Sequence, residues 1–424
     1  MKYQRTLHRS IVMTFVILSL SFLLPAPATF AADEDGFKVG GALRFNYRYM
    51  DWDDEGYARI NNAQQGELLL DTYRINVDGT YGNIDLSLEY RFYSGYHMLH
   101  HGYFGYNFSD RTTMHFGVHQ VPFGIQPYAS HNWFFSIAYY LGLEDDYDAG
   151  IKFMHQTEGG LNLQFAYYKN DEGNFTGASD NSSRYSYDIV DETFFGMQSN
   201  NRESHQFNAR IAYTITEGDL NAELGVSGQY GMLYNEALDQ INSSDDPDSL
   251  YNGDSDPWGS HMAIGGHANI TYDKFNLMLF GIYVDHDPQV LNADSLLVGN
   301  PMDLDGDFSE ERVVFGAYDF PYPVASTGIV VAVQPAYTVP VEWGPISSLQ
   351  FYNDFSMYMK DNEDFENSIQ NITGCLVTAG SVYTYVDVAQ GKNQPWLGQF
   401  TGLGQGVEDA EWKMRFNINF GYYF

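Results

Sequence analysis

The stretch FKVGGALRFNYRYM, residues 37–50, alternates apolar and polar side chains over fourteen positions. Successive side chains of a strand point to opposite faces, so one face would carry Phe37, Val39 and Leu43 and the other the polar set. A tilted membrane-spanning strand needs about 9–11 residues, whereas strands of ordinary proteins average about 5–6. The length of this alternation therefore predicts a transmembrane strand.

The connections between such stretches alternate in length along the chain. Short turns are expected near 82–83, 109–111, 158–160, 217–219, 273–274, 343–345 and 380–381, and long polar loops near 51–65, 122–146, 172–204, 235–259, 286–325, 360–370 and 392–410. With a shorter loop near 94–99, seven turns and eight loops join about 16 strands, and residues 312–341 could hide an extra hairpin. This arrangement predicts an all-β protein, a transmembrane antiparallel up-and-down β-barrel with short periplasmic turns and long extracellular loops.

The N-terminal segment indicates export. Basic Lys2, Arg5 and Arg9 precede an apolar run from residue 11 to 24, which is too short for a spanning helix, and small residues follow up to Ala31. We therefore expect a signal peptide at 1–31 and a transmembrane barrel at 32–424. Together with the strand pattern, this predicts the outer membrane of a Gram-negative bacterium, with outer-membrane lipid around the barrel.

Composition narrows the function classes. Removing residues 1–31 takes away three basic and no acidic residues, so the formal charge falls from −34 to −37. Such acidity argues against nucleic acid as a partner. The single cysteine, Cys375, excludes an intramolecular disulfide framework and a cysteine-rich metal site. Short motifs of hydrolases, phosphate loops and zinc proteases do not occur, so we expect no enzyme, no catalytic residues, no metal and no cofactor.

Two segments resemble a known family. Residues 116–124, FGVHQVPFG, and residues 380–387, GSVYTYVD, followed by GKNQP at 391–395, resemble the phosphate-selective porin O and P family. The resemblance implies a homotrimer in which the third long loop, here 122–146, folds into the barrel as a constriction loop. In this chain that loop has no Lys or Arg, which argues against phosphate selectivity. Its candidate residues are His131, Trp133, Glu144, Asp145 and Asp146.

Charged side chains in the lumen phase of the strands are the candidates for pore selectivity. Nine basic residues occupy such positions: Lys38, Arg44, Arg48, Arg74, Arg91, Lys152, Arg210, Lys413 and Arg415. Seven of them lie on the first three strands and the last, which closure would place side by side as one wall. Facing acidic groups, including the run 144–146, would create a transverse field. Alternatively, the charges pair within the wall and only satisfy one another.

The last strand and the polar segments complete the expectations. Alternating aromatic residues that include Phe420, Tyr422 and Phe424 predict a signal for the barrel assembly machinery. Acidic segments at 51–55, 244–248 and 303–307 would attract cations to the pore mouth. His97, His100 and His101 are expected in a short loop. The leading hypothesis is a porin, a water-filled channel for passive diffusion of small hydrophilic solutes and ions. An outer-membrane enzyme, or a plugged adhesin or structural barrel, are the alternatives.

Overall fold

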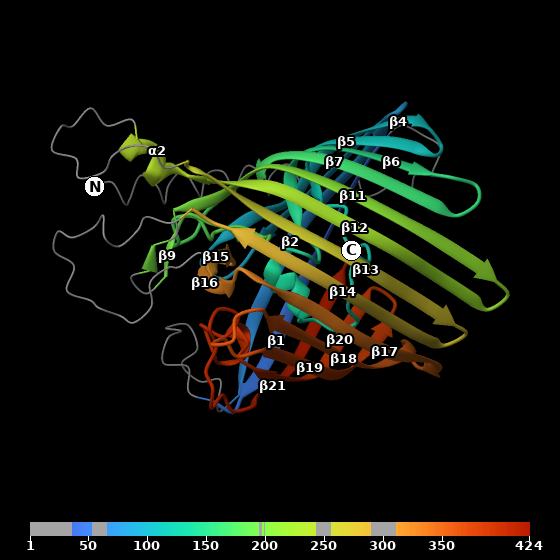
Figure 1. The fold of residues 1–424 in the computed structure, drawn as a ribbon. Coiled ribbons are helices and arrows are strands. Elements are labelled where there is room, and N and C mark those ends of the chain that lie inside the picture. The colour runs from blue at the N-terminus through green and yellow to red at the C-terminus, as the bar shows by residue number, and fades with distance from the viewer. Residues whose placement is uncertain (1–35, 53–65, 195–196, 199, 243–255, 290–310) are drawn as a thin grey trace, which may run out of the picture.

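The computed structural model describes residues 36–52, 66–194, 197–198, 200–242, 256–289 and 311–424, so the expected signal peptide and most of the acidic segments at 51–55, 244–248 and 303–307 lie outside the described residues. Sixteen antiparallel strands of the described chain form a closed barrel (Figure 1). They are β1 Gly36–Met50, β2 Glu67–Tyr81, β3 Ile84–Phe92, β4 His97–Ser109, β5 Thr112–Gln120, β6 Tyr147–Gln156, β7 Leu161–Asp171, β11 Asn201–Glu217, β12 Leu220–Asn235, β13 Trp258–Tyr272, β14 Phe275–Asp287, β17 Thr327–Trp343, β18 Ile346–Lys360, β19 Ser368–Ala379, β20 Val382–Lys392 and β21 Lys413–Tyr423.

The predicted fold class is confirmed. Each of the seven expected short turns joins two neighbouring wall strands, and β21 pairs with β1 from Ala42↔Tyr423 to Met50↔Arg415 to close the ring. Closure leaves no sheet edge, so the backbone groups of the wall are paired within the protein, as a structure surrounded by lipid requires.

Side chains on the outer face of the wall are apolar. Val39, Phe104 and Phe116, on three different strands, are 57%, 59% and 62% exposed. The residues next to them on each strand have side chains on the opposite face, toward the lumen. Tyr81 and Trp343 stand exposed beside the short turns, where an aromatic girdle is typical of membrane barrels. The outer surface therefore has the composition of a lipid-facing one.

Helices are few in the described chain. The structure has one short α-helix, α2 (Glu236–Asn242), and two 3-10 turns, η2 (Ile137–Leu141) and η4 (Pro395–Leu397). None of the helices in the described residues is long and apolar enough to cross a membrane.

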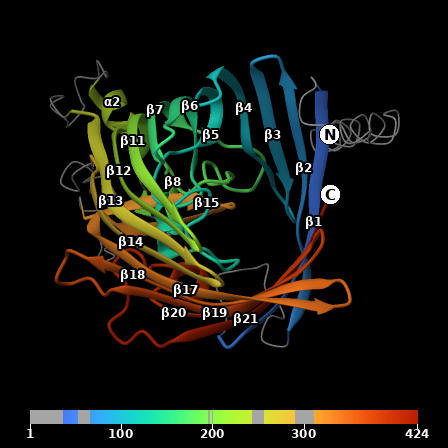
Figure 2. The same ribbon diagram turned by 90° about the vertical axis from the view of Figure 1, so that its right-hand side faces the viewer.

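The hairpin suspected within residues 312–341 exists, but it is not part of the wall. Strands β15 (Arg312–Ala317) and β16 (Phe320–Ala325) pair with each other and with β8 (Asp188–Ile189) as a separate three-stranded sheet. Figure 2 shows β8 and β15 inside the ring of wall strands. Two further short strands, β9 (Thr193–Phe194) and β10 (Met197–Gln198), form a separate pair.

This inner sheet corrects the expectation that 172–204 and 286–325 are simply external loops. Their apolar residues, including Tyr187, Ile189 and Phe315, are buried in one cluster with the loop after β5 and with inward side chains of the wall, such as Val284 and Val330. Short apolar stretches inside polar segments pack against whatever apolar surface is near. Part of the lumen is therefore filled by a hydrophobic core.

Deleting Phe424 is expected to lower the amount of folded barrel in the membrane. The Phe424 amide donates to the Gly41 carbonyl at 3.0 Å, and the Gly41 amide donates to the Phe424 carbonyl at 2.9 Å. Losing two closing hydrogen bonds weakens the β21–β1 pair by about 2 kcal/mol. The measurement is the heat-modifiable fraction in isolated membranes. Phe424→Tyr should be normal, and so should the lipid-facing control Phe116→Ala; normal abundance of the deletion would contradict the prediction.

Candidate functional site

Five arginines converge on one part of the lumen. Arg44 and Arg48 lie on β1, Arg74 on β2, Arg91 on β3 and Arg415 on β21, and these four strands are neighbours in the ring. All five line a cavity of about 1060 Å³. Their side chains lie on the lumen-facing side of the strands, and Arg74 on β2 pairs directly with Arg91 on β3. The structure therefore places these five of the nine basic candidates together, and we name them the arginine wall.

The charges of the arginine wall are only partly balanced. Arg44 pairs with Asp71 at 2.8 Å and Arg48 with Glu67 at 2.5 Å. Arg74 and Arg91 share Glu89, at 3.3 and 2.5 Å. Three carboxylates thus serve four guanidinium groups.

Arg415 differs from the other four. It makes no ion pair within 4.0 Å in the described part of the chain; it donates to Asn417 at 3.0 Å and lies over the ring of Phe134 at 4.9 Å. Five arginines against these three carboxylates leave a surplus of two positive charges on this wall. Pairing within the wall is real but incomplete.

The other four basic candidates lie elsewhere. Lys152 donates to the Gln120 carbonyl at 2.6 Å, and Arg210 donates to the Gly124 carbonyl at 2.7 Å and pairs with Glu223 at 2.5 Å. Both side chains hold the start of the loop after β5. Lys38 is exposed and Lys413 pairs with Glu411 at 3.3 Å. None of these four lines the cavity.

The loop between β5 and β6 crosses the lumen to the far wall. The His131 amide and its Nδ1 reach the two carboxylate oxygens of Asp354 on β18 at 2.7 and 2.8 Å. Gln370 on β19 donates to the Phe135 carbonyl at 2.7 Å, and Ser356 on β18 accepts from the Ile137 amide at 3.0 Å. His131 therefore anchors the loop to the wall and does not line the cavity, whereas Trp133 does.

The acidic run of this loop does not face the arginine wall as a group. Glu144 accepts hydrogen bonds from Ala129, Ser130 and Ser136 and so closes the loop on itself. Asp146 turns away from the cavity, and only Asp145 lines it. Burial raises the pKa of Asp145 to about 7, although the Tyr185 hydroxyl and the charge of Arg91 act in the opposite direction. Glu144 and Asp146 are therefore not among the facing acidic groups that the expected transverse field needs, and Asp145 is the one member of the run that lines the cavity.

Aromatic side chains occupy the place that acidic ones were expected to take. Eleven tyrosines line the cavity: Tyr93, Tyr96, Tyr128, Tyr139, Tyr140, Tyr185, Tyr187, Tyr318, Tyr383, Tyr385 and Tyr423. Arg91 lies over the Tyr185 ring at 4.4 Å and Arg74 over the Tyr423 ring at 4.9 Å, which are cation–π distances. Sequence reasoning missed this surface because it assigned aromatic residues to the lipid interface. Eight of these tyrosines belong to loops and to the inner hairpin connection, and only Tyr383, Tyr385 and Tyr423 lie on wall strands.

The histidine expectation also needs correction. His97, His100 and His101 lie on strand β4, not in a loop. A register shift opposite Glu89 and Tyr90 brings His100 and His101 together, with their Nδ1 atoms 2.8 Å apart. A bulge of this kind, which re-aims one side chain, leaves no simple mark in the sequence.

The anchor of the loop predicts a pH-dependent conductance. Burial alone would lower the pKa of His131, but the hydrogen bond and charge of Asp354 raise it overall. The stabilising ion pair is therefore present below the ordinary histidine pKa of about 6.5 and is lost as pH rises through the raised value. We expect single-channel conductance to be higher and noisier at pH 9 than at pH 5, as the loop loosens.

Asp354→Asn should weaken the anchor at every pH, by on the order of 3 kcal/mol, and abolish this dependence. His155→Asn, beside a short turn, is the matched control and should keep it. A pH response that survives in Asp354→Asn would place its origin elsewhere.

Comparison with known proteins identifies the fold. No protein-family model and no curated protein matches this chain. Among solved structures it is similar to the anion-selective porin from Comamonas acidovorans, with 15% identity, a TM-score of 0.53 and 92% of this chain and 100% of that one covered. It is also similar to Salmonella typhi OmpF in complex with daunomycin (11%, 0.52, 93% and 99%) and to the outer-membrane channel DcaP of Acinetobacter baumannii (11%, 0.51, 94% and 100%).

At such identities the likeness concerns the fold alone. The chain is a closed 16-stranded barrel with the fold of bacterial outer-membrane porins. The predicted location in the outer membrane of a Gram-negative bacterium agrees with this fold.

Proposed function

We propose that the protein is a passive porin for small hydrophilic solutes and ions, with a constriction that favours anions. The observation that carries this proposal is the cavity of about 1060 Å³ between the arginine wall and the loop after β5. A surplus of positive charge beside a narrow, partly desolvated passage attracts anions more strongly than the same charge in bulk water. Nothing in this function requires a catalytic residue, a metal or a cofactor, and we propose no enzyme activity.

Several finer assignments belong to this proposal. They are the inward loop 122–146 as the part that sets conductance, a homotrimer, a signal peptide at 1–31 and recognition of Phe420, Tyr422 and Phe424 by the barrel assembly machinery. A relationship to the phosphate-selective porin O and P family is supported by residues 116–124 and 380–387. Phosphate selectivity is not part of the proposal, since the loop lacks Lys and Arg.

A planar bilayer tests the proposal directly. The purified protein should form steady, ohmic pores, and a salt gradient should give a reversal potential on the anion side at molar salt. Under these conditions the surface charges are screened within about 3 Å, whereas the constriction is screened less. A membrane that stays non-conducting after reconstitution of folded, heat-modifiable protein would overturn it.

One observation favours the alternative of a plugged barrel. The apolar cluster built from the loop after β5 and the hairpin β15–β16 fills the lumen beside β13, β14, β17 and β18. If it extends across the whole section, the protein would be an adhesin or structural barrel. Absence of conductance together with binding of intact cells to a surface would support that alternative.

A further inference from the structure

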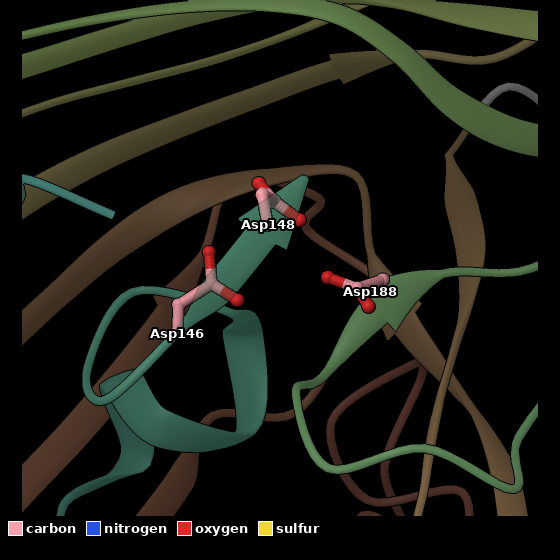
Figure 3. Close-up of side chains that lie close together, drawn as sticks. All are labelled: Asp146, Asp148 and Asp188. Atoms are coloured by element: carbon pink, nitrogen blue, oxygen red, sulfur yellow. The ribbon is translucent and has the colours of Figure 1, made fainter. Parts of the chain in front are cut away.

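A group of carboxylates is buried where the loop after β5 ends and meets the inner sheet. Asp146 ends that loop, Asp148 lies at the start of β6 and Asp188 on β8, so three segments contribute one residue each. The three side chains point toward one another (Figure 3), and one oxygen of each lies within 4.8 Å of the others. Their exposed fractions are 6%, 2% and 1%, so water does not compensate their charge.

The basic partner of this group is Arg184. It pairs with Asp188 at 3.0 Å and with Asp171 at 2.6 Å, and lies 4.0 Å from Glu172. In the described part of the chain, no other basic group comes within 4.0 Å of Asp146, Asp148 or Asp188. The carboxylate of Glu203 lies beside this group, since it accepts a hydrogen bond at 2.8 Å from the amide of Ile189, the residue after Asp188. The single positive charge of the Arg184 guanidinium therefore cannot balance all the carboxylates buried around it.

Two carboxylate oxygens in this group have no hydrogen-bond donor among the residues that the structure describes. They are Oδ1 of Asp148 and Oε2 of Glu172, both on side chains that are more than nine-tenths buried. Buried polar atoms are nearly always paired, and an unpaired buried carboxylate oxygen is costly. The other oxygen of Asp148 accepts from Gln206 at 3.1 Å, which fixes the carboxylate in place. Among the described residues, these two oxygens therefore lack a partner that would compensate their burial.

Protons or a cation could supply that positive charge. Burial, and then the charge of Asp188, raise the pKa of Asp146 and of Glu172 well above their ordinary values. A proton, however, neutralises one carboxylate and bridges two at most, whereas a divalent cation satisfies three at once. Oxygen ligands without sulfur or imidazole are typical of hard cations.

We propose that Asp146, Asp148 and Asp188 bind a divalent cation with the chemistry of Ca²⁺, assisted by the charge of Glu172. Ca²⁺ accepts sets of carboxylate oxygens supplied by the protein in flexible geometry, whereas Mg²⁺ demands near-ideal octahedral geometry and usually keeps several waters. A group of carboxylates buried between three segments of the chain fits the first behaviour. The ion joins the end of the constriction loop to the wall and to the inner sheet, so that it fixes the loop from the side opposite to the His131–Asp354 anchor.

Calorimetric titration tests this site independently of channel function. Folded protein in detergent is stripped with EGTA and titrated with calcium chloride. We expect one site with submillimolar affinity, at least ten-fold weaker binding of magnesium chloride, and a rise of several degrees in the unfolding temperature with calcium. Asp148→Asn and Asp188→Asn should each weaken calcium binding at least ten-fold.

Asp364→Asn provides the matched control, because it makes the same charge change at an exposed position between β18 and β19 and should bind calcium normally. Calcium binding that is unchanged in both cluster variants would overturn the proposal, and so would an absence of heat and of thermal shift for the stripped wild-type protein in 1 mM calcium. If the variants do not fold, the wild-type titration decides alone.

Discussion

Replacing residues 126–142 by a short Gly-Ser connection is expected to enlarge the single-channel conductance several-fold. This segment carries Trp133, Phe134, Phe135, Tyr139 and Tyr140, all of which line the cavity beside the arginine wall. It reaches β18 through the bonds of His131 and Ile137, so it occupies the lumen and not the rim. Its removal opens the passage and exposes a wider water-filled section.

The same deletion removes the apolar turn Ile137–Leu141 from the inner core, so folding must be checked by heat-modifiability. The wall itself should persist, because its closure rests on backbone pairs between strands. Shortening residues 361–367, the segment between β18 and β19, is the control and should leave conductance close to that of the wild type. Equal or smaller conductance in the folded 126–142 variant would refute the constriction role of this loop.

The double replacement Arg44→Gln with Arg91→Gln should move the reversal potential toward cations. It removes two charges from a wall whose surplus is two, while Asp71 and Glu89 keep theirs. The electrostatic change in a partly aqueous passage is about 1 kcal/mol or more, which corresponds to roughly five-fold in the anion-to-cation permeability ratio. The measurement is the zero-current potential in a tenfold potassium chloride gradient.

Salt concentration and a control variant sharpen this prediction. The protein's acidic charge should favour cations at low salt, because the Debye length is then about 30 Å at 0.01 M, and the arginine wall should dominate at high salt. Arg111→Gln, on the exposed turn between β4 and β5, removes a paired charge far from the cavity and should leave the potential unchanged. If the double variant keeps the reversal potential of the wild type, the charges of the arginine wall do not determine ion selectivity.

The wall of this protein could be predicted from the sequence almost completely. A membrane barrel permits only paired strands, so the period-two pattern from residue 37 onward and the alternating turns and loops determine the topology. The same period placed Arg44, Arg74 and Arg91 on the inward face. Closure of the ring then brought Arg415 beside them.

The contents of the lumen could not be predicted in the same way. The direction of Glu144, Asp145 and Asp146 depends on loop geometry, in which successive side chains follow no fixed period. The grouping of Asp148 with Asp188 joins residues forty positions apart through an inner strand, β8, that is only two residues long. No pattern of two residues distinguishes such a strand from its polar surroundings.

The apolar filling beside β13, β14, β17 and β18 divides the inner surface of the barrel into a wet side and a dry side. On the dry side, Tyr358 and Tyr322 are fully buried and donate to the carbonyls of Ala325 and Tyr140 at 2.7 Å. Truncating such residues should cost about 3–5 kcal/mol, as in the interior of a soluble domain. An engineer can therefore rewrite the charges of β21, β1, β2 and β3 to choose which solutes pass, whereas the dry strands must be treated as a folded core.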